Sequence, residues 1–485
     1  MRDMVLVLNF DDISSRAVTR KLRSERILCK IVPGDISLEE IQAQDPSGLL
    51  LAGSTAGEAP LGLDGRIMQS GLPILALGDA AALLLSALEG TPGEKTIEGV
   101  VAPLQYARVP LLEDLEDGER YISCARDFTL PELVDPICRS GDIIIGFAHE
   151  SLPLFGLQFE VEQNDPEGSL LLRNFALSIC HCTTWWDDDA FVARAVEEID
   201  RVVGDGTAVC AMTGGVDSGV SALLAYKALG SRLKCIFVDT GLLRAQEGDN
   251  FIAFYRDTIG MDITRVYAQD RFLSMLRGIE DPQEKRRVIG ETIQQILREE
   301  KEKLGVFDAA ISGTSFHDIM FNQQSGPRPA LSNSIPVIEP VRELFKDEIR
   351  RIGDYLGIPA ALIAQQPFPG SGLALRILGE VTLERLQTLR AVDAIFCDEL
   401  QQAGLTKRLW QYFAVLCPMP GDEQGAVICL RSVQSASDSG QAYAARLPYD
   451  VVEAVVEKAM EQRPEVRRVV YDLTPSRSYT GVEWQ

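Results

Sequence analysis

Residues 213–218, which read TGGVDS, bring glycines, hydroxyls and a carboxylate together in one short stretch. An apolar run, AVCAM, precedes the stretch and a helical pattern, GVSALLAYKALG, follows it, so we predict a turn between a strand and a helix. The amides and the dipole at the start of such a helix attract anions, and glycines let a phosphate approach the backbone. Thr213 and Ser218 would add hydroxyl donors, and Asp217 would hold a metal ion that neutralises the phosphates.

An ordinary structural turn, with Asp217 or Ser218 as the helix cap, is the alternative interpretation of this stretch. The GxxxxGKS or GxxxxGKT loop of another nucleotide-binding class does not occur in the chain. The ten cysteines include no CxxC pair, which favours reduced thiols over disulfides or a zinc site. His317 could face the same turn, but the sequence does not favour a catalytic role for it.

The elements around the turn indicate an α/β protein of several domains, because 485 residues suffice for about three ordinary domains. Apolar runs that are typical of strands occur at 4–10, 48–53, 72–78 and 143–149. A second series starts at 207, with helices predicted from Asp217, Gly248, Pro282 and Arg342. A helix at 191–204 connects the two series, and a third segment starts near 367. We therefore predict domains at 1–190, 191–366 and 367–485.

Composition excludes several classes of protein. The formal net charge of −24 argues against nucleic-acid binding, because phosphate backbones are bound by basic surfaces. Apolar runs do not reach the roughly 18 to 20 residues of a membrane span, and an acidic stretch interrupts the N-terminal apolar run where a signal peptide would continue. We therefore expect a cytoplasmic protein with neither nucleic acid nor membrane as a partner.

The TGGVDS stretch resembles the pyrophosphate-binding loop, SGGxDS, of the adenine-nucleotide α-hydrolases, with Thr213 in place of the first serine. The segments FVDTGLLR, DPQEKRRVIG, EPVRELFKDEIRRIGDYLGIP, PFPGSGLALRILGEVT, LPYD, RRVVYDLT and VEWQ resemble GMP synthetases, in the same order, over nearly all of 207–485. The resemblance implies a class I glutaminase-like α/β domain, an adenine-nucleotide α-hydrolase-like domain with a parallel sheet, and a small α+β dimerisation domain.

The resemblance also implies a chemistry and its residues. The 2-oxygen of xanthosine monophosphate (XMP) would attack the α-phosphorus of ATP, pyrophosphate would leave with Mg²⁺, and ammonia would displace AMP. It assigns catalysis to Asp217, Ser218 and Asp318, and the metal to Asp217. It assigns ATP binding to Thr213, Gly214, Gly215, Val216, Asp217, Ser218, Val238, Asp239 and Gly313. It assigns binding of the purine nucleotide to Phe368, Pro369, Gly370, Gly372, Arg376, Arg431, Arg477 and Glu483.

The N-terminal domain departs from the glutaminase pattern at the residues that do chemistry. The family places its cysteine nucleophile in a GxCxG turn, where this chain has Gly78. The His-Pro-Glu that follows GLQF in the family is replaced here, with Glu160 for the histidine and Glu162 for the glutamate. Hydrolysis of an amide through a thioester needs a thiolate and a base, so we predict that glutaminase activity is lost. The segment 321–340 also lacks the lysine of the family's lid.

Two functions of different classes follow from these observations. The first is an ATP-dependent carbon–nitrogen ligase that aminates XMP or a close analogue, with ammonia that is free or supplied by another protein. A different acceptor or amine is a variant of this hypothesis. The second is a non-catalytic nucleotide-binding paralogue that regulates or scaffolds a partner. A tRNA-thiolating relative is disfavoured, because such enzymes usually need reactive cysteines and a basic face. The resemblance further implies a homodimer formed by residues from about 370 onward.

Overall fold

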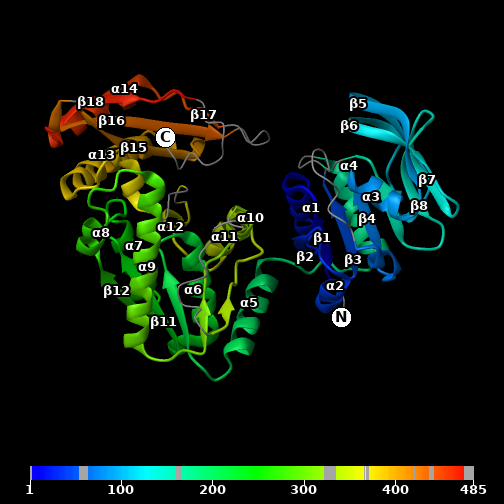
Figure 1. Cartoon of the computed structure of the whole chain (residues 1–485), viewed down its shortest axis with the longest axis horizontal. Coiled ribbons are helices and arrows are strands. Elements are labelled where there is room, and N and C mark those ends of the chain that lie inside the picture. The colour runs from blue at the N-terminus through cyan, green and yellow to red at the C-terminus, as the bar shows by residue number, and fades with distance from the viewer. Residues whose placement is uncertain are drawn as a thin grey trace. The chain divides into compact units, whose positions relative to one another are not determined.

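Parallel strands form the centre of both halves of the chain, as the apolar runs predict (Figure 1). The structure is a computed structural model that describes residues 3–53, 64–159, 161, 165–321, 335–364, 366, 371–419, 421–435 and 442–474. The chain divides into two compact units, Met1–Phe191 and Val192–Gln485. The division of the second unit at 366/367 stays a prediction.

The first unit is a mixed sheet with helices. Its elements are β1 (Val5–Asn9), α1 (Asp12–Ser24), β2 (Cys29–Pro33), α2 (Leu38–Gln44), β3 (Gly48–Ala52), β4 (Ile74–Leu77), α3 (Ala80–Ala87), β5 (Thr91–Tyr106), β6 (Gly118–Thr129), β7 (Val134–Ser140), β8 (Ile143–His149), β9 (Leu154–Leu157) and α4 (Pro166–Arg173). The strand order is β2-β1-β3-β4-β9-β8-β7-β5-β6. Pairings from β2 to β9 are parallel, and those from β9 to β6 are antiparallel.

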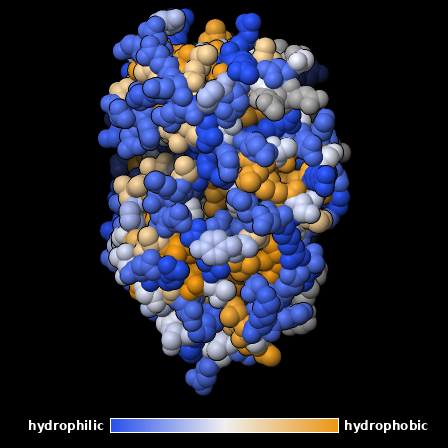
Figure 2. Space-filling model, turned by 90° about the vertical axis from the view of Figure 1, so that its left-hand side faces the viewer, coloured by the Kyte–Doolittle hydropathy of each residue, from blue (hydrophilic) through white to orange (hydrophobic). Residues whose placement is uncertain are grey.

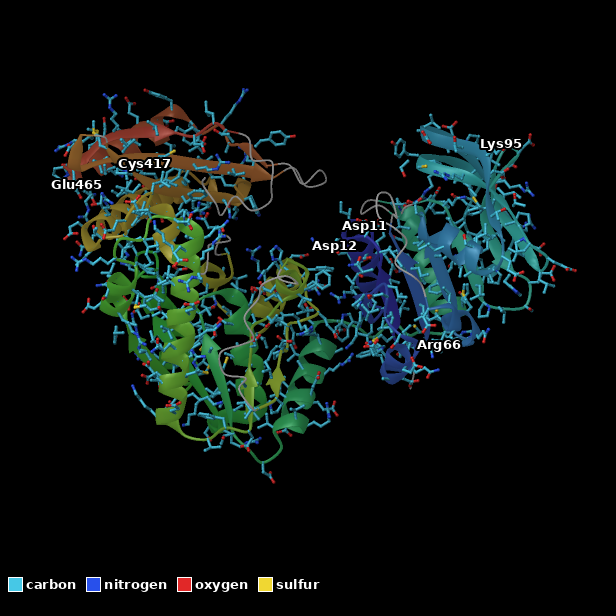
Figure 3. All side chains as sticks on the ribbon, viewed as in Figure 1. Asp11, Asp12, Arg66, Lys95, Cys417 and Glu465 are labelled. Atoms are coloured by element: carbon cyan, nitrogen blue, oxygen red, sulfur yellow. The ribbon has the colours of Figure 1, made fainter. Side chains whose placement is uncertain are left out.

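Apolar sequence explains the parallel half of this sheet better than the antiparallel half. The strands β3 and β4 are buried throughout, because parallel strands are covered on both faces. The strands β5 and β6 were not predicted, because exposed polar residues interrupt their apolar positions. Asp11 caps α1 by accepting from the amide of Ser14 at 2.9 Å, and it lies at the N-terminal end of this helix (Figure 3).

The second unit has a parallel sheet in its first part. Its elements are α5 (Asp188–Val203, which begins just before the unit), β10 (Ala208–Met212), α6 (Val216–Leu229), β11 (Leu233–Asp239), α7 (Glu247–Ile252), β12 (Ile263–Tyr267), α8 (Gln269–Met275), α9 (Pro282–Leu304), β13 (Ala309–Ile311), α10 (Phe316–Phe321), β14 (Val337–Ile338), α11 (Lys346–Tyr355) and α12 (Ala360–Ile363). The strand order is β12-β11-β10-β13-β14. The order reverses between β10 and β13, which is where open α/β sheets bind ligands.

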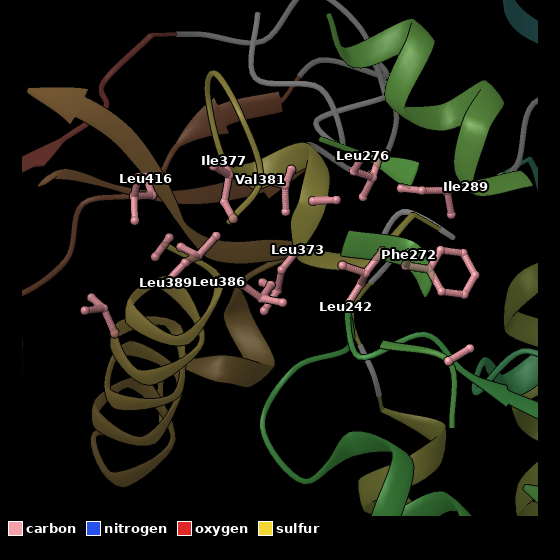
Figure 4. Close-up of a cluster of buried hydrophobic side chains, with 14 of the residues drawn as sticks. Leu242, Phe272, Leu276, Ile289, Leu373, Ile377, Val381, Leu386, Leu389 and Leu416 are labelled. Carbon is pink, nitrogen blue, oxygen red and sulfur yellow. The ribbon is translucent and has the colours of Figure 1, made fainter. Parts of the chain in front are cut away.

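An α+β layer follows in the same unit. It consists of the 3₁₀ turn η6 (Gly372–Arg376), α13 (Leu383–Gln402), β15 (Gln411–Met419), β16 (Asp422–Ser435), β17 (Ala442–Ala444), α14 (Tyr449–Gln462) and β18 (Val466–Tyr471). One hydrophobic cluster extends from Val209 in the parallel sheet to Val466 in this layer. Figure 4 shows side chains of this cluster from both parts, among them Phe272, Leu373 and Leu416. The predicted α/β fold class is therefore confirmed, and the two parts of this unit share a core.

The helix predicted from Arg342 begins four residues later, at Lys346. Glu348 accepts a hydrogen bond from the amide of Phe345 at 2.8 Å and thereby fixes the start of α11. Arg342 instead pairs with Glu339 in the preceding turn. In the part of the chain that the structure describes, none of the helices combines the length and the apolar character needed to cross a membrane. Figure 2 shows hydrophobic areas on an otherwise mostly hydrophilic face.

Candidate nucleotide-binding site

The TGGVDS stretch forms the turn between β10 and α6, as predicted, and it lies at the reversal point of the sheet. Gly214 has a φ of +88°, a conformation that favours glycine. Gly215 is the N-cap residue of α6, and no side chain among the described residues caps this helix. The first amides of α6 are therefore not occupied by a capping side chain, which leaves donors for an anion.

Ser218 braces this turn from within. Its buried hydroxyl accepts a hydrogen bond from the amide of Thr213 at 3.1 Å and donates to the carbonyl of Gly215 at 3.0 Å. The hydroxyl of Thr213 lies 3.1 Å from the hydroxyl oxygen of Ser218. Ser218 thus shapes the loop instead of capping the helix, and the capping alternative does not describe the observed contacts of this side chain.

Gly313 closes the other side of the reversal point. It follows β13, and a Cβ atom at this position would lie 2.7 Å from the backbone nitrogen of Ser218. The turn after β13 therefore packs directly against the start of α6, and only glycine allows this approach. The sequence prediction grouped Gly313 with the loop, and the structure brings the two together.

Asp217 forms an ion pair with Lys346, the first residue of α11. The Asp217 side chain is 23% exposed and that of Lys346 is 41% exposed. Burial raises the pKa of Asp217, while the positive charge of Lys346 lowers it and the charge of Asp318 raises it. A carboxylate and an ammonium group therefore lie together beside the open end of α6.

Asp318 has a local structural contact. Its carboxylate accepts hydrogen bonds from the amide of Ser315 at 2.9 Å and from the hydroxyl of Ser315 at 2.6 Å, at the start of α10. Its negative charge acts on Asp217, so the two carboxylates share one region. His317 is exposed. Among the described residues, no cluster of three or more His, Cys, Asp or Glu side chains is placed to hold a metal ion.

Val238 and Asp239 end the neighbouring strand β11, beside the turn after β10. The Asp239 carboxylate accepts from Arg265 at 2.6 and 3.0 Å and from the amide of Gly241 at 3.1 Å. Asp239 lines a cavity of about 640 Å³ and another of about 220 Å³. The end of β11 is thus accessible, while Arg265 fixes the orientation of its carboxylate.

The residues assigned to the purine nucleotide fall into two groups. Phe368, Pro369, Gly370, Arg477 and Glu483 lie outside the described residues. Arg376 is fully buried, with its guanidinium 3.3 Å from the ring centre of Phe413, and burial lowers its pKa to about 9. Arg431 is 6% exposed and pairs with Asp472. Gly372 has a φ of +61° and packs against the carbonyl of Leu242. The buried arginines offer little surface for direct contact with a ligand.

Gly78 occupies a turn of similar type in the first unit, between β4 and α3. Its φ is +64°, and its amide donates to the carbonyl of Leu157 at 2.9 Å. Glu160 and Glu162 lie outside the described residues. Burial raises the pKa of the thiol of Cys124, on β6. It also raises the pKa of the thiol of Cys138, on β7, to about 12. Gly78, which the sequence places at the family's nucleophile, thus lies in a turn with a positive φ and has no side chain.

Lys346, Arg265 and Arg390 were not assigned to the site from the sequence. Lys346 stands 129 positions from Asp217, and its helix reads as an ordinary solvated helix. The match of FKDEIR to the family was the only signal that could have selected Lys346. No sequence motif pointed to Arg265 or Arg390, because Arg265 contacts the end of a strand and Arg390 contacts backbone carbonyls.

Comparison with known proteins finds relatives that match this chain over its whole length. Residues 398–484 match the family described as the GMP synthase C terminal domain. The chain is 36% identical to a glutamine-hydrolyzing GMP synthase of Clostridium botulinum over 513 aligned residues, which cover all of both chains. It is 34% identical to that of Clostridium tetani over 510 aligned residues, again with full coverage. A solved structure of a glutamine amidotransferase from Thermotoga maritima is 15% identical, covers 33% of this chain and 76% of that chain, and has a TM-score of 0.29.

Proposed function

The chain belongs to the GMP synthase family, and on this premise we propose that it is an ATP-dependent ligase that has kept amination and lost glutamine hydrolysis. In the proposed reaction, the 2-oxygen of XMP or a close purine nucleotide attacks the α-phosphorus of ATP and releases pyrophosphate. Ammonia then attacks carbon 2 and displaces AMP. Adenylation is needed because a purine carbonyl oxygen is a poor leaving group.

The observation that carries this proposal is the open start of α6 beside Asp217 and Lys346. A Cβ atom at Gly214 or Gly215 would have its nearest neighbours 3.6 and 3.8 Å away, so space remains above both glycines. Backbone amides, the helix dipole and the ammonium group of Lys346 all favour negative charge at this point. A pyrophosphate fits this combination better than a neutral ligand does.

Each residue of the site has a separate task in this proposal. The amides of the turn stabilise the charge that develops on the leaving pyrophosphate, and the Ser218 brace keeps these amides in place before the reaction starts. Lys346 adds a positive charge on the side of α11. Asp217, with Asp318 near it, would hold Mg²⁺, which when bound neutralises phosphate charge. The positive charge of Lys346 favours the ionised form of Asp217 and opposes burial, which raises the pKa of this carboxyl.

The residues of the first unit support the proposed loss of the glutaminase. Gly78 has no nucleophilic atom, and glutamate at 160 cannot replace the base that a thiol needs. The nitrogen must then come from ammonia, either free or delivered by another protein. The first unit would keep its fold without chemistry of its own.

We propose in addition a homodimer that forms through the layer from about residue 370 onward. The edge strand β18 and the residues that follow it expose Val470 and Leu473, and Tyr443 of β17 is exposed as well. Contiguous exposed apolar area is typical of contact surfaces, and these groups would contribute to it. Sedimentation at micromolar concentration would give the mass of a dimer, and a fully active monomer would contradict the proposal.

The decisive experiment supplies the purified protein with ATP, Mg²⁺ and a panel of oxopurine nucleotides, and follows pyrophosphate and AMP. We expect product with ammonium and XMP or a close analogue, and none with glutamine. Glutamine together with an unrelated glutaminase is the control, because it should restore the reaction. Glutamate that forms from glutamine at the rate of AMP formation would contradict the loss of glutaminase activity. Binding of ATP without release of pyrophosphate in the presence of any acceptor would favour the non-catalytic alternative.

A further inference from the structure

The loop that follows β11, residues 240–244, is held by the α+β layer of the second unit. The amide of Leu373 donates to the carbonyl of Leu242 at 2.7 Å, and Gly372 packs against the same carbonyl. The side chain of Leu242 lies in the hydrophobic cluster together with Leu373 and Leu386 (Figure 4). The loop is therefore built into this layer, although it belongs in sequence to the parallel sheet.

Arg390 of α13 makes the most direct contact with this loop. Its guanidinium donates to the carbonyl of Leu243 at 3.0 Å and to the carbonyl of Gly241. Burial lowers the pKa of Arg390, and the negative charge of Asp239 opposes this effect. Arg390 and Asp239 line the same cavity of about 220 Å³. A single cation thus holds two carbonyls of the loop and faces the carboxylate at the end of β11.

A second arginine anchors the far end of the loop. Arg244 forms an ion pair with Asp393 at 3.0 Å and donates to the carbonyl of Tyr412 at 3.1 Å. Asp393 is 2% exposed, and it also accepts from the amide of Ala414 at 2.9 Å. Asp393 lies on α13, the same helix as Arg390. Both ends of the loop are therefore fixed by one helix.

Gly241 connects the held loop to Asp239. Its amide donates to the Asp239 carboxylate at 3.1 Å, while its carbonyl accepts from Arg390. Gly241 has a φ of +69°, and it packs so closely against Gln269 that a Cβ atom would collide with that side chain. A flexible glycine in this place keeps its conformation only as long as its two peptide groups are held.

We propose that Arg390 is a positioning residue for ATP, which acts through Gly241 to keep Asp239 and the end of β11 in the conformation that binds the nucleotide. This inference rests on the proposed function, because it takes the end of β11 as part of the ATP site. Without Arg390, a fraction of the molecules would hold the loop in other conformations. The apparent affinity for ATP is proportional to the fraction of molecules that keeps the binding conformation, so it falls as that fraction falls. Affinity for the purine acceptor and the rate at saturating ATP would change little.

The test compares Arg390→Gln, Arg390→Lys and Arg385→Gln in the full chain. Arg385 is the matched control, because it also lies on α13 and donates to a backbone carbonyl, that of Glu380 at 2.9 Å, outside the loop. Titration calorimetry with ATP and Mg²⁺, without acceptor, measures binding. Steady-state kinetics gives KM for ATP, KM for the acceptor and kcat.

We expect Arg390→Gln to weaken ATP binding about tenfold or more and to raise KM for ATP equally, with kcat and the acceptor KM within about twofold of wild type. Arg390→Lys keeps the charge with a different donor geometry, so a loss of about threefold is expected. Arg385→Gln should bind ATP like the wild type. Unchanged ATP affinity in Arg390→Gln, or an equal loss in Arg385→Gln, would overturn the proposal.

Two further outcomes separate this inference from the function on which it rests. If Arg390→Gln does not fold, Arg390→Lys decides, because unchanged ATP affinity in that variant overturns the positioning role and a loss of about threefold supports it. If the wild type binds ATP and releases pyrophosphate while Arg390→Gln matches it, only the inference fails. If the wild type neither binds ATP nor releases pyrophosphate, the proposed function fails and the inference fails with it.

Discussion

The turn after β4 in the first unit and the turn after β10 in the second are built alike. Each connects the C-terminal end of a parallel strand to a helix, and each has a glycine with positive φ, Gly78 at +64° and Gly214 at +88°. Their surroundings differ. The second turn has the Ser218 brace and the pair of Asp217 with Lys346, whereas Gly78, predicted to stand at the position of the family's nucleophile, has no side chain.

This difference shows that the backbone conformation of a turn and the chemistry of the side chains around it are separate requirements. A strand-to-helix turn aims its residues at the edge of the sheet, and a glycine makes the required conformation possible. Binding and catalysis then depend on the charges and nucleophiles that neighbouring elements bring to that edge. In our proposal the first unit keeps the geometry of such a turn without its chemistry, whereas the second unit keeps residues for both.

The strongest test of the comparison is Asp217→Ala. The control is Asp79→Ala, since Asp79 follows Gly78 in the turn of the first unit. Removing the proposed metal ligand should lower the rate of pyrophosphate release about a thousandfold. The free energy of unfolding should fall by only about 0.3–1 kcal/mol, the usual contribution of a carboxylate in the first turn of a helix. Asp79→Ala should release pyrophosphate at the wild-type rate. Near-normal turnover of Asp217→Ala with lowered thermal stability would mean that the turn after β10 is only structural.

The charge of Lys346 can be tested by Lys346→Gln through rate and pH dependence. Loss of one cation at the proposed pyrophosphate site should lower the rate on the order of tenfold. Activity should fall as the pH decreases through the pKa of Asp217, because the carboxylate must be ionised to hold a cation. Burial raises that pKa, and the charge of Lys346 lowers it. Removal of the Lys346 charge should therefore move the acidic limb of the pH–rate profile to higher pH. A profile that does not move would exclude this coupling.

The smallest effect is expected when the missing nucleophile is restored to the first turn. Gly78→Cys should produce no glutamate from glutamine, because glutamate at position 160 is a much weaker base for the thiol than a histidine. The variant should lose about 1 kcal/mol of unfolding free energy, since a side chain at a φ of +64° is strained. Amination with ammonium should stay at the wild-type level. Appreciable glutaminase activity would show that the first unit lacks only the nucleophile.

Local pattern made part of the site predictable. The apolar run, the glycines and the helical pattern within 208–229 are neighbours in the sequence. Their order alone therefore predicts a turn that binds anions. The pairing of Asp217 with Lys346 was not predictable in this way, because 129 residues separate them. The strands β5 and β6 were missed for a related reason, since their stability comes from pairing with each other, in antiparallel register.

The sequence by itself determined the α/β class, the loop and the absence of a nucleophile at Gly78, because each depends on residue types and short spacings. Only the tertiary structure decided what lies around these residues. It buried Arg376 over Phe413, directed Ser218 into its own loop, and placed Arg390 on the carbonyls of Gly241 and Leu243. Such contacts join segments that are distant in sequence, and they form because packing of the shared core brings helices and strand ends together. Burial and local charge, which set the pKa of Asp217, exist only after that packing.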